Sequence, residues 1–139
     1  MKRYIGIKIV DAEPGLCPAG GRGEHPEGVD GYKVVYKDGY TSWSPRDVFE
    51  EAYRPMAGMS FGIAIEAMKQ GHRVARKGWN GRGIFIELQN PTDLSKMTHP
   101  YIFIDTTGLQ SDNEHAPRDL VPWLASQTDM LSDDWQIVA

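Results

Sequence analysis

Hydrophobic and polar positions alternate in short segments along the first third of the chain, which is the pattern of half-buried β-strands. These segments, rich in Ile, Val and aromatic residues, are Tyr4–Val10, Tyr32–Lys37 and Tyr40–Trp43. The last two flank Asp38-Gly39, and glycine accepts the positive φ that a tight primed turn requires. We therefore expect three strands here, the last two joined as a hairpin.

Two breaks in this pattern predict a loop and a helix. Glu13–Gly31 is dense in glycine and proline, which is typical of a long loop. Ser44, a proline directly after it and the acidic Asp47 predict the start of a helix. The helix should end before Pro55. Residues 1–55 are therefore expected to form a small β-rich module with one helix.

After a short uncharged junction, the pattern changes to that of a helix. Apolar residues recur at i, i+3, i+4 and i+7 from Phe61 to Met68, with Ser60 in front as a cap and Gly71 behind as a stop. Segments with strand composition follow at Arg73–Lys77, Ile84–Leu88, Tyr101–Asp105, Leu120–Leu124 and Trp135–Val138. Pro122 favours an edge or a bulge for its strand.

Polar stretches separate these segments. Gln89–Pro100 and Gly108–Arg118 are predicted loops, and Ser126–Asp129 resembles the entry to a short helix. Together the patterns predict an α+β fold. Residues 56–139 should form a small, mostly antiparallel sheet with one main helix, preceded by a β-hairpin-plus-helix module over residues 1–55.

Composition and charge narrow the class of protein. The 139 residues carry a formal net charge of -4, which argues against a long nucleic-acid partner, because phosphate backbones are held by clustered Lys and Arg. The single cysteine, Cys17, excludes a disulfide within the chain. No run of about 18 apolar residues occurs, so we expect no membrane span and a cytoplasmic protein.

The segment richest in chemistry is the turn predicted after Arg73–Lys77. Between Arg73 and Gly83 the chain gathers four cations, a tryptophan, an asparagine and several glycines. Arginine can donate two parallel hydrogen bonds to a phosphate, Trp79 offers a stacking face, and glycines let backbone N–H groups approach an anion. Asn80 can read a base edge or hold a ribose hydroxyl. A nucleotide needs these groups, but a solvated basic strand whose Trp79 covers the edge of the core explains the same residues.

A second polar cluster lies at the predicted entry to the short helix. Ser126, Gln127 and Thr128 bring hydroxyl and amide groups to a helix N-terminus, where free backbone N–H groups favour an anion. The alternative is structural, with Ser126 or Thr128 as the helix cap and Asp129 complementing the helix dipole. Both interpretations stay open at this point.

Catalytic and metal-binding patterns are sparse. Asp133-Asp134, or Asp105 with Asp129, are candidate carboxylate pairs for hydrolysis, but adjacent acids in a polar stretch are usually solvated. The four histidines lack the i, i+4 spacing of a helical metal site, and Cys17 has no evident base beside it. We expect no catalytic residue, no metal and no cofactor.

Two motifs change the balance between these interpretations. The run MSFGIAIEAMKQG at residues 59–71, followed by VARKGWNG at residues 74–81, resembles the start of the Thoeris anti-defence 2-like family. The run LVPWLASQTDML at residues 120–131, with an Asp-Trp pair shortly after it, resembles the end of that family. The two motifs stand in the family's order, and the resemblance covers Met59–Ala139.

The resemblance implies a phage or prophage protein that acts as a sponge in the host cytoplasm. It would bind a cyclic ADP-ribose isomer made by a TIR-domain immune enzyme, or a cyclic oligonucleotide, and keep it from its effector without cleaving it. It also implies a homo-oligomer, a tetramer or a dimer, with ligand pockets between subunits and no enzymatic activity. Carried over onto this sequence, the implied ligand contacts are Arg76, Trp79, Asn80, Gln127, Thr128 and Asp129.

The chain departs from a minimal member of the family by its N-terminal module and by a longer loop at Ser111–Arg118. Two alternatives to a sponge therefore stay open. A hydrolase of ADP-ribose-like or cyclic-nucleotide substrates would use Asp129 or Asp105. A phage structural or protein-interaction component would work through residues 1–55.

Overall fold

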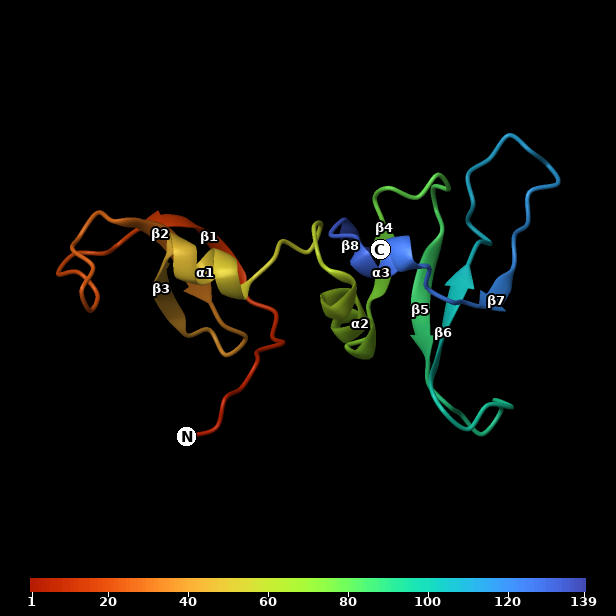
Figure 1. The fold of residues 1–139 in the computed structure, drawn as a ribbon, viewed down its shortest axis with the longest axis horizontal. Coiled ribbons are helices and arrows are strands. Elements are labelled where there is room, and N and C mark those ends of the chain that lie inside the picture. The colour runs from red at the N-terminus through yellow and green to blue at the C-terminus, as the bar shows by residue number, and fades with distance from the viewer. The chain divides into compact units, whose positions relative to one another are not determined.

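The computed structural model describes residues 1–139, which form two compact units, Met1–Arg54 and Pro55–Ala139 (Figure 1). Each unit has its own antiparallel sheet and at least one helix, so the predicted α+β class is confirmed. None of the helices has the length and apolar character needed to span a membrane.

The N-terminal unit is a three-stranded antiparallel sheet followed by a short helix. Its strands lie in the order β1-β2-β3, and its elements are β1 (Asp11–Leu16), β2 (Asp30–Val35), β3 (Thr41–Pro45) and α1 (Arg46–Ala52). Its buried hydrophobic residues are Cys17 and Val34. The Trp43 indole lies against Gly31, where no Cβ would fit, and its Nε1 donates to the Gly15 carbonyl at 2.9 Å. This indole therefore ties the two outer strands together across β2.

The first strand does not lie where the sequence pattern predicts it. Tyr4–Val10 forms no strand and is largely exposed, so that prediction is wrong. The strand begins instead with Asp11, which lies opposite Val35 of β2. Because β2 ends at Val35, its pairing with β1 begins at Asp11. The loop is shorter than the predicted Glu13–Gly31, because β1 extends to Leu16 and β2 begins at Asp30.

The hairpin between β2 and β3 is confirmed, but its turn differs from the predicted primed type. Gly39 has a φ of 86°, whereas no residue other than glycine has a positive φ, so Asp38 does not take a left-handed position. The Tyr36 N–H donates to the Tyr40 carbonyl at 2.8 Å, and the Gly39 N–H donates to the Tyr36 carbonyl at 2.8 Å. The loop is therefore one residue longer than a primed turn and ends on a left-handed glycine.

Helix α1 begins one residue later than predicted. Pro45, expected at the first helical position, is the N-cap, and no side chain caps the helix, so Ser44 is not its cap. The reason is that Pro45 is also the last residue of β3, opposite Gly31 of β2, and keeps an extended ψ of 147°. The helix ends before Pro55, as predicted.

The C-terminal unit contains a five-stranded sheet in the order β7-β6-β5-β4-β8, and every pairing in it is antiparallel (Figure 1). Its elements are α2 (Phe61–Lys69), β4 (Arg73–Arg76), β5 (Phe85–Gln89), β6 (Tyr101–Asp105), β7 (Leu120–Pro122), α3 (Gln127–Leu131) and β8 (Trp135–Val138). All the helices and strands predicted for this region are confirmed, with small shifts of their ends.

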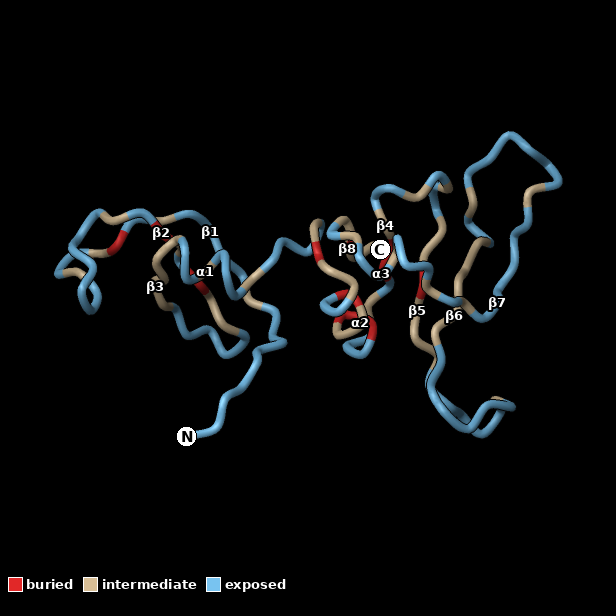
Figure 2. Tube along the Cα trace, viewed as in Figure 1, coloured by how far each residue is buried: buried red, intermediate tan, exposed pale blue.

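The core of this unit lies between α2 and the middle of the sheet (Figure 2). Val74, Ile86 and Trp135 are fully buried and come from β4, β5 and β8. They pack with Met68, from the predicted apolar stripe of α2. Ser60 caps α2 as predicted, because its Oγ accepts the N–H three residues later at 3.4 Å. Burial of this stripe holds α2 against the sheet.

The free edge of β8 is covered by the segment that leads into α2. Met59 and Trp135 exchange two backbone hydrogen bonds, of 2.8 and 3.1 Å, and the Ile137 N–H donates to the Met56 carbonyl at 3.0 Å. These bonds satisfy backbone groups that an open edge would expose. At the opposite edge, β7 contains Pro122, whose missing N–H suits an edge position, as predicted.

Candidate functional site

The turn that follows β4 carries one half of the candidate site. Trp79 is half-buried there and packs edge-on against Trp123 and Trp135, with ring centroids 6.1 and 5.4 Å away. Its Nε1 donates to Oδ1 of Asp129 at 3.1 Å. The indole therefore belongs partly to the core, which the structural interpretation of Trp79 expected.

Arg76, at the end of β4, is the centre of an ion-pair network. Its Nε and Nη2 donate to the two carboxylate oxygens of Asp134 at 2.9 and 3.4 Å, and its Nη1 donates to Asp129 at 2.9 Å. The Arg76 side chain is only 13% exposed, so water screens these pairs weakly. The hydrogen bonds to Asp134 and then to Asp129 raise the pKa of Arg76 above its ordinary value.

Asp129 also completes the capping box of α3. Ser126 Oγ accepts the Asp129 N–H at 3.0 Å, and Asp129 Oδ2 accepts the Ser126 N–H at 3.3 Å. Burial alone would raise the pKa of Asp129, but the hydrogen bonds from Trp79, Arg76 and Ser126 outweigh it and lower the pKa. One carboxylate thus joins α3 to β4 and to the turn that follows β4.

The role of Asp134 in this network was not predicted from the sequence. Besides Arg76, it accepts the backbone N–H of Gly78 at 2.8 Å. The hydrogen bond from Arg76 is the main cause of a lowered pKa at Asp134, and the bond from Gly78 adds to it. No local signal separates Asp134 from the exposed Asp133, because Arg76 lies 58 residues away in the sequence.

Glycines let the turn between β4 and β5 lie close to neighbouring segments. A Cβ at Gly78 would lie 2.7 Å from a carboxylate oxygen of Asp134, and one at Gly83 would collide with the Gly108 carbonyl. These approaches fix the turn at both ends. Asn80, between them, is exposed to solvent.

The structure connects three of the six predicted ligand contacts by hydrogen bonds: Arg76, Trp79 and Asp129. Gln127 and Thr128 are exposed at the start of α3. Asn80 is exposed beside Trp79 and bonds to none of the others. The two sequence motifs, 50 residues apart at their point of contact, therefore meet in one place.

The other candidate side chains from the sequence are the metal-binding types, Cys17 and Asp105. No group of three or more His, Cys, Asp or Glu side chains is placed to share a metal ion. Cys17 is buried, and its Sγ donates to the His25 carbonyl at 3.7 Å. Asp105 accepts the N–H and the hydroxyl of Thr107 at 2.9 and 2.6 Å, so its carboxylate caps the chain after β6.

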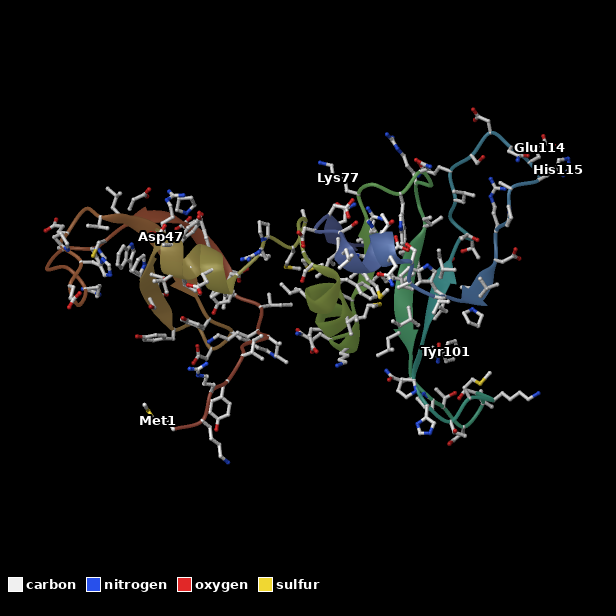
Figure 3. All side chains as sticks on the ribbon, in the orientation of Figure 1. Met1, Asp47, Lys77, Tyr101, Glu114 and His115 are labelled. Carbon is white, nitrogen blue, oxygen red and sulfur yellow. The ribbon has the colours of Figure 1, made fainter.

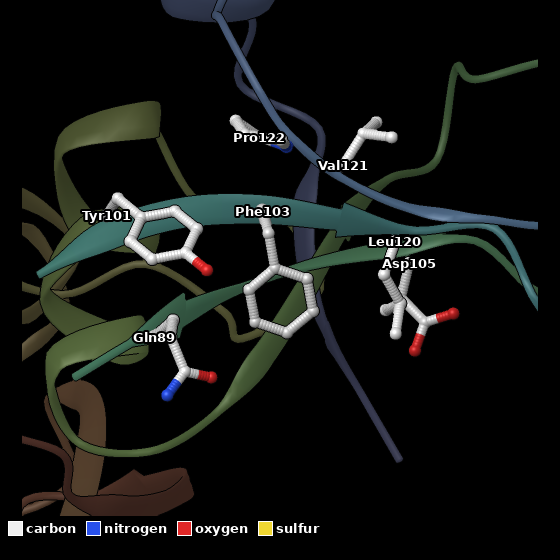
Figure 4. Close-up of a pocket in the computed structure, with 7 residues that line it drawn as sticks. All are labelled: Gln89, Tyr101, Phe103, Asp105, Leu120, Val121 and Pro122. Carbon is white, nitrogen blue, oxygen red and sulfur yellow. The ribbon is translucent and has the colours of Figure 1, made fainter. Parts of the chain in front are cut away.

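A shallow hollow of about 310 Å³ lies on the side of the sheet that points away from the core (Figure 4). Tyr101, Phe103 and Asp105 alternate along β6 toward this side, while Ile102 and Ile104 between them pack against the core. The hollow is lined by Gln89, Tyr101, Phe103, Asp105, Leu120, Val121 and Pro122. Its exposed lining is about as polar as it is apolar, because Gln89, Asp105 and the Tyr101 hydroxyl share it with apolar side chains.

Comparison with known proteins gives two matches. The model of the Thoeris anti-defense 2-like domain family matches residues 59–138, the part of the chain that holds both sequence motifs. The chain is also similar to the protein named Thoeris anti-defense 2 of Bacillus phage SP01, with 39% identity over 95 residues. That similarity covers 58% of this chain and 96% of the phage protein.

Proposed function

Because this chain belongs to the Thoeris anti-defense 2-like family, we propose that it counters a bacterial anti-phage defence by sequestering the small-molecule signal of that defence. The ligand we propose is a cyclic ADP-ribose isomer, with a cyclic oligonucleotide as a second candidate of the same chemistry. The ligand-binding domain in this proposal spans residues 56–139. Residues 1–55 are a separate module.

The observation that carries the proposal is the hydrogen-bonded junction between Trp79 and Asp129. It places an indole that can stack on a base beside the exposed start of α3. Gln127 and Thr128, exposed and close to Asp129 in the sequence, offer amide and hydroxyl groups, and Asn80, exposed and next to Trp79 in the sequence, offers an amide. A nucleotide-type ligand needs this combination of a stacking face and hydrogen-bonding groups.

The state of the carboxylates supports sequestration over cleavage. A general base must have a free oxygen and a pKa near the working pH. Asp129 instead accepts hydrogen bonds from Arg76, Trp79 and Ser126, and its pKa is lowered. Asp105 is held by Thr107. Asp129 therefore lacks the properties that the hydrolase alternative requires, whereas Asp105 uses only its Oδ1 in the bonds from Thr107.

The expected affinity is consistent with a sponge. Stacking on Trp79 is worth about 1–3 kcal/mol, and each charge-assisted bond to a phosphate about 1.5–3 kcal/mol. With two or three such bonds the total approaches the roughly 8 kcal/mol of a micromolar complex. Tighter binding requires a preorganised, closed pocket, which a second subunit can supply.

The proposal includes self-association into a dimer or a tetramer. The hollow on the outer side of the sheet supports it, because the large side chains of Tyr101, Leu120 and Val121 are exposed there. Exposed large apolar side chains that lie together on a surface favour contact with another protein surface.

Binding followed by denaturation tests the proposal. Purified protein is titrated with the cyclic ADP-ribose isomer in a calorimeter, and the complex is then heated and the released compound identified. Stoichiometric binding with release of the intact compound is expected. Conversion by sub-stoichiometric protein would establish the hydrolase instead, and absence of binding to cyclic nucleotides would leave the protein-interaction alternative.

A further inference from the structure

Arg76 is poorly suited to bind a phosphate, although it is the arginine next to the tryptophan turn. Its Nε, Nη1 and Nη2 all donate to carboxylate oxygens of Asp134 or Asp129. One guanidinium and two carboxylates leave the network with a net negative charge, which repels an anion. Two of its five N–H groups remain unused, but the side chain is only 13% exposed, and a phosphate approaching it would meet both carboxylates.

Two other cations flank Trp79-Asn80 in the sequence. Lys77 and Arg82 are exposed, and neither side chain makes an ion pair or hydrogen bond within the chain. Figure 3 shows the Lys77 side chain extending outward from the start of the turn. Their positive charge is therefore available to a ligand that stacks on Trp79.

The backbone of the same turn supplies further donors. The N–H groups of Lys77–Trp79 are used within the chain. Those of Asn80 and Gly81 bond to no acceptor in it. Two consecutive backbone N–H groups that have no acceptor in the chain are available to donate to an anion. Because the turn is fixed at both ends, these donors are in place before a ligand arrives.

We infer that Lys77, Arg82 and the backbone N–H groups of Asn80 and Gly81 form an anion-binding site that takes a phosphate or pyrophosphate group. Arg76 is a positioning residue that holds the turn against α3 without touching the ligand. The inference rests on the proposed function, because it assigns the phosphate end of the same nucleotide site.

Inorganic pyrophosphate tests the anion site without any assumption about the nucleotide. In ¹H–¹⁵N spectra of the full chain, titration with pyrophosphate should shift the amide signals of Asn80 and Gly81. A Lys77→Gln/Arg82→Gln double variant should show neither shift while keeping the rest of the spectrum. Wild-type spectra in which pyrophosphate moves no amide of the turn would overturn the inference.

The nucleotide end of the site is tested by calorimetry with a cyclic ADP-ribose isomer. The Lys77→Gln/Arg82→Gln variant should bind it about 10-fold more weakly for each cation removed. A matched Arg3→Gln/Lys96→Gln variant removes the same charge from two other exposed positions and should bind as the wild type does. Equal affinities of the two double variants contradict the inference.

The two experiments separate this inference from the proposed function. Amide shifts with pyrophosphate, but no binding of cyclic nucleotides, would keep the anion site and remove the proposed function. Tight nucleotide binding that the Lys77→Gln/Arg82→Gln variant retains would keep the proposed function and remove the anion site.

Discussion

At the scale of single residues, Asp129 joins three segments of the C-terminal unit. It accepts hydrogen bonds from Arg76 of β4, from Trp79 of the following turn and from Ser126 at the start of its own helix. Charge-assisted bonds between partly buried groups are stronger than pairs on an exposed surface. Asp134 supports the same turn from a second direction, so the two carboxylates together fix where Trp79 lies.

Asp134→Asn should lower the free energy of unfolding by about 1–3 kcal/mol, because Arg76 then loses one of its two charged partners. Urea unfolding followed by circular dichroism measures the change. Asp133→Asn is the control, since that neighbour is exposed, and it should stay within about 0.5 kcal/mol of the wild type. Equal effects of the two substitutions would argue against the assigned role of Asp134.

Acid should weaken the same network. The folded-state pKa values of Asp129 and Asp134 are lowered. A group of this kind contributes stability that is present above its unfolded pKa and lost as the pH falls through its folded pKa. The melting temperature should therefore fall as the pH is lowered below about 4, the ordinary pKa of a carboxyl group. The fall should be less steep in Asp134→Asn than in the wild type. The same dependence of melting temperature on pH in the two proteins would show that Asp134 does not contribute to the loss of stability in acid.

Trp79→Ala should abolish most ligand binding and also lower stability by about 2–4 kcal/mol, since the ring packs on two other tryptophans. Trp79→Phe keeps an aromatic face but loses the Nε1 bond to Asp129. It should stay folded and retain part of the affinity. Calorimetry on both variants, with melting curves, separates packing from stacking. A folded Trp79→Ala variant with wild-type affinity would remove Trp79 from the site.

At the scale of elements, the helices and strands with a regular pattern of apolar residues could be predicted from the sequence. The stripe from Phe61 to Met68 predicted α2, and alternation or β-branched composition predicted the strands of the five-stranded sheet. β1 could not be predicted, because Asp11–Leu16 contains Pro14 and lacks strand composition. Its position is set by β2, a long-range pairing that no local pattern encodes.

The candidate site was predictable to the same limited extent. The turn around Trp79 and the helix entry at Ser126 could be recognised as two motifs. The hydrogen bonds that join them run through Asp129 and Asp134, 53 and 58 residues beyond Arg76. Such pairings depend on which strands become neighbours, and therefore on the fold as a whole.

The β2–β3 hairpin gives a test at this scale. Gly39→Ala should destabilise the protein by about 1–2 kcal/mol, because an alanine at a φ of 86° is strained although space is open around it. Gly6→Ala is the control, since Gly6 has open space and no positive φ. Thermal melts compare the two. A neutral Gly39→Ala would mean that the loop adopts another conformation at little expense.

At the scale of the whole molecule, a net charge of -4 means that an anionic ligand meets no general attraction. Recognition then depends on cations that are free at the site itself. Lys77 and Arg82 meet this condition, whereas Arg76 is neutralised by its carboxylate partners. Affinity for a phosphate should accordingly fall as salt screens the few charges involved.

Leu120→Asp should reduce self-association, because Leu120 lines the hollow on the outer side of the sheet, is 61% exposed, and a carboxylate there opposes burial. Light scattering coupled to gel filtration measures the mass of the particle. Val48→Asp, at an exposed apolar position of α1, is the matched control and should leave the mass unchanged. An unchanged mass for Leu120→Asp would place the subunit contact elsewhere.

The paired backbones of Met59 and Trp135 bring the beginning and the end of the family domain side by side. The two ends of the domain therefore lie close together. Such a domain accepts an added sequence at its start without a change in the order of its strands. A circularly permuted form of residues 56–139 should still fold when its new ends lie within the exposed loop at Ser111–Arg118 and its original ends are joined by a short linker.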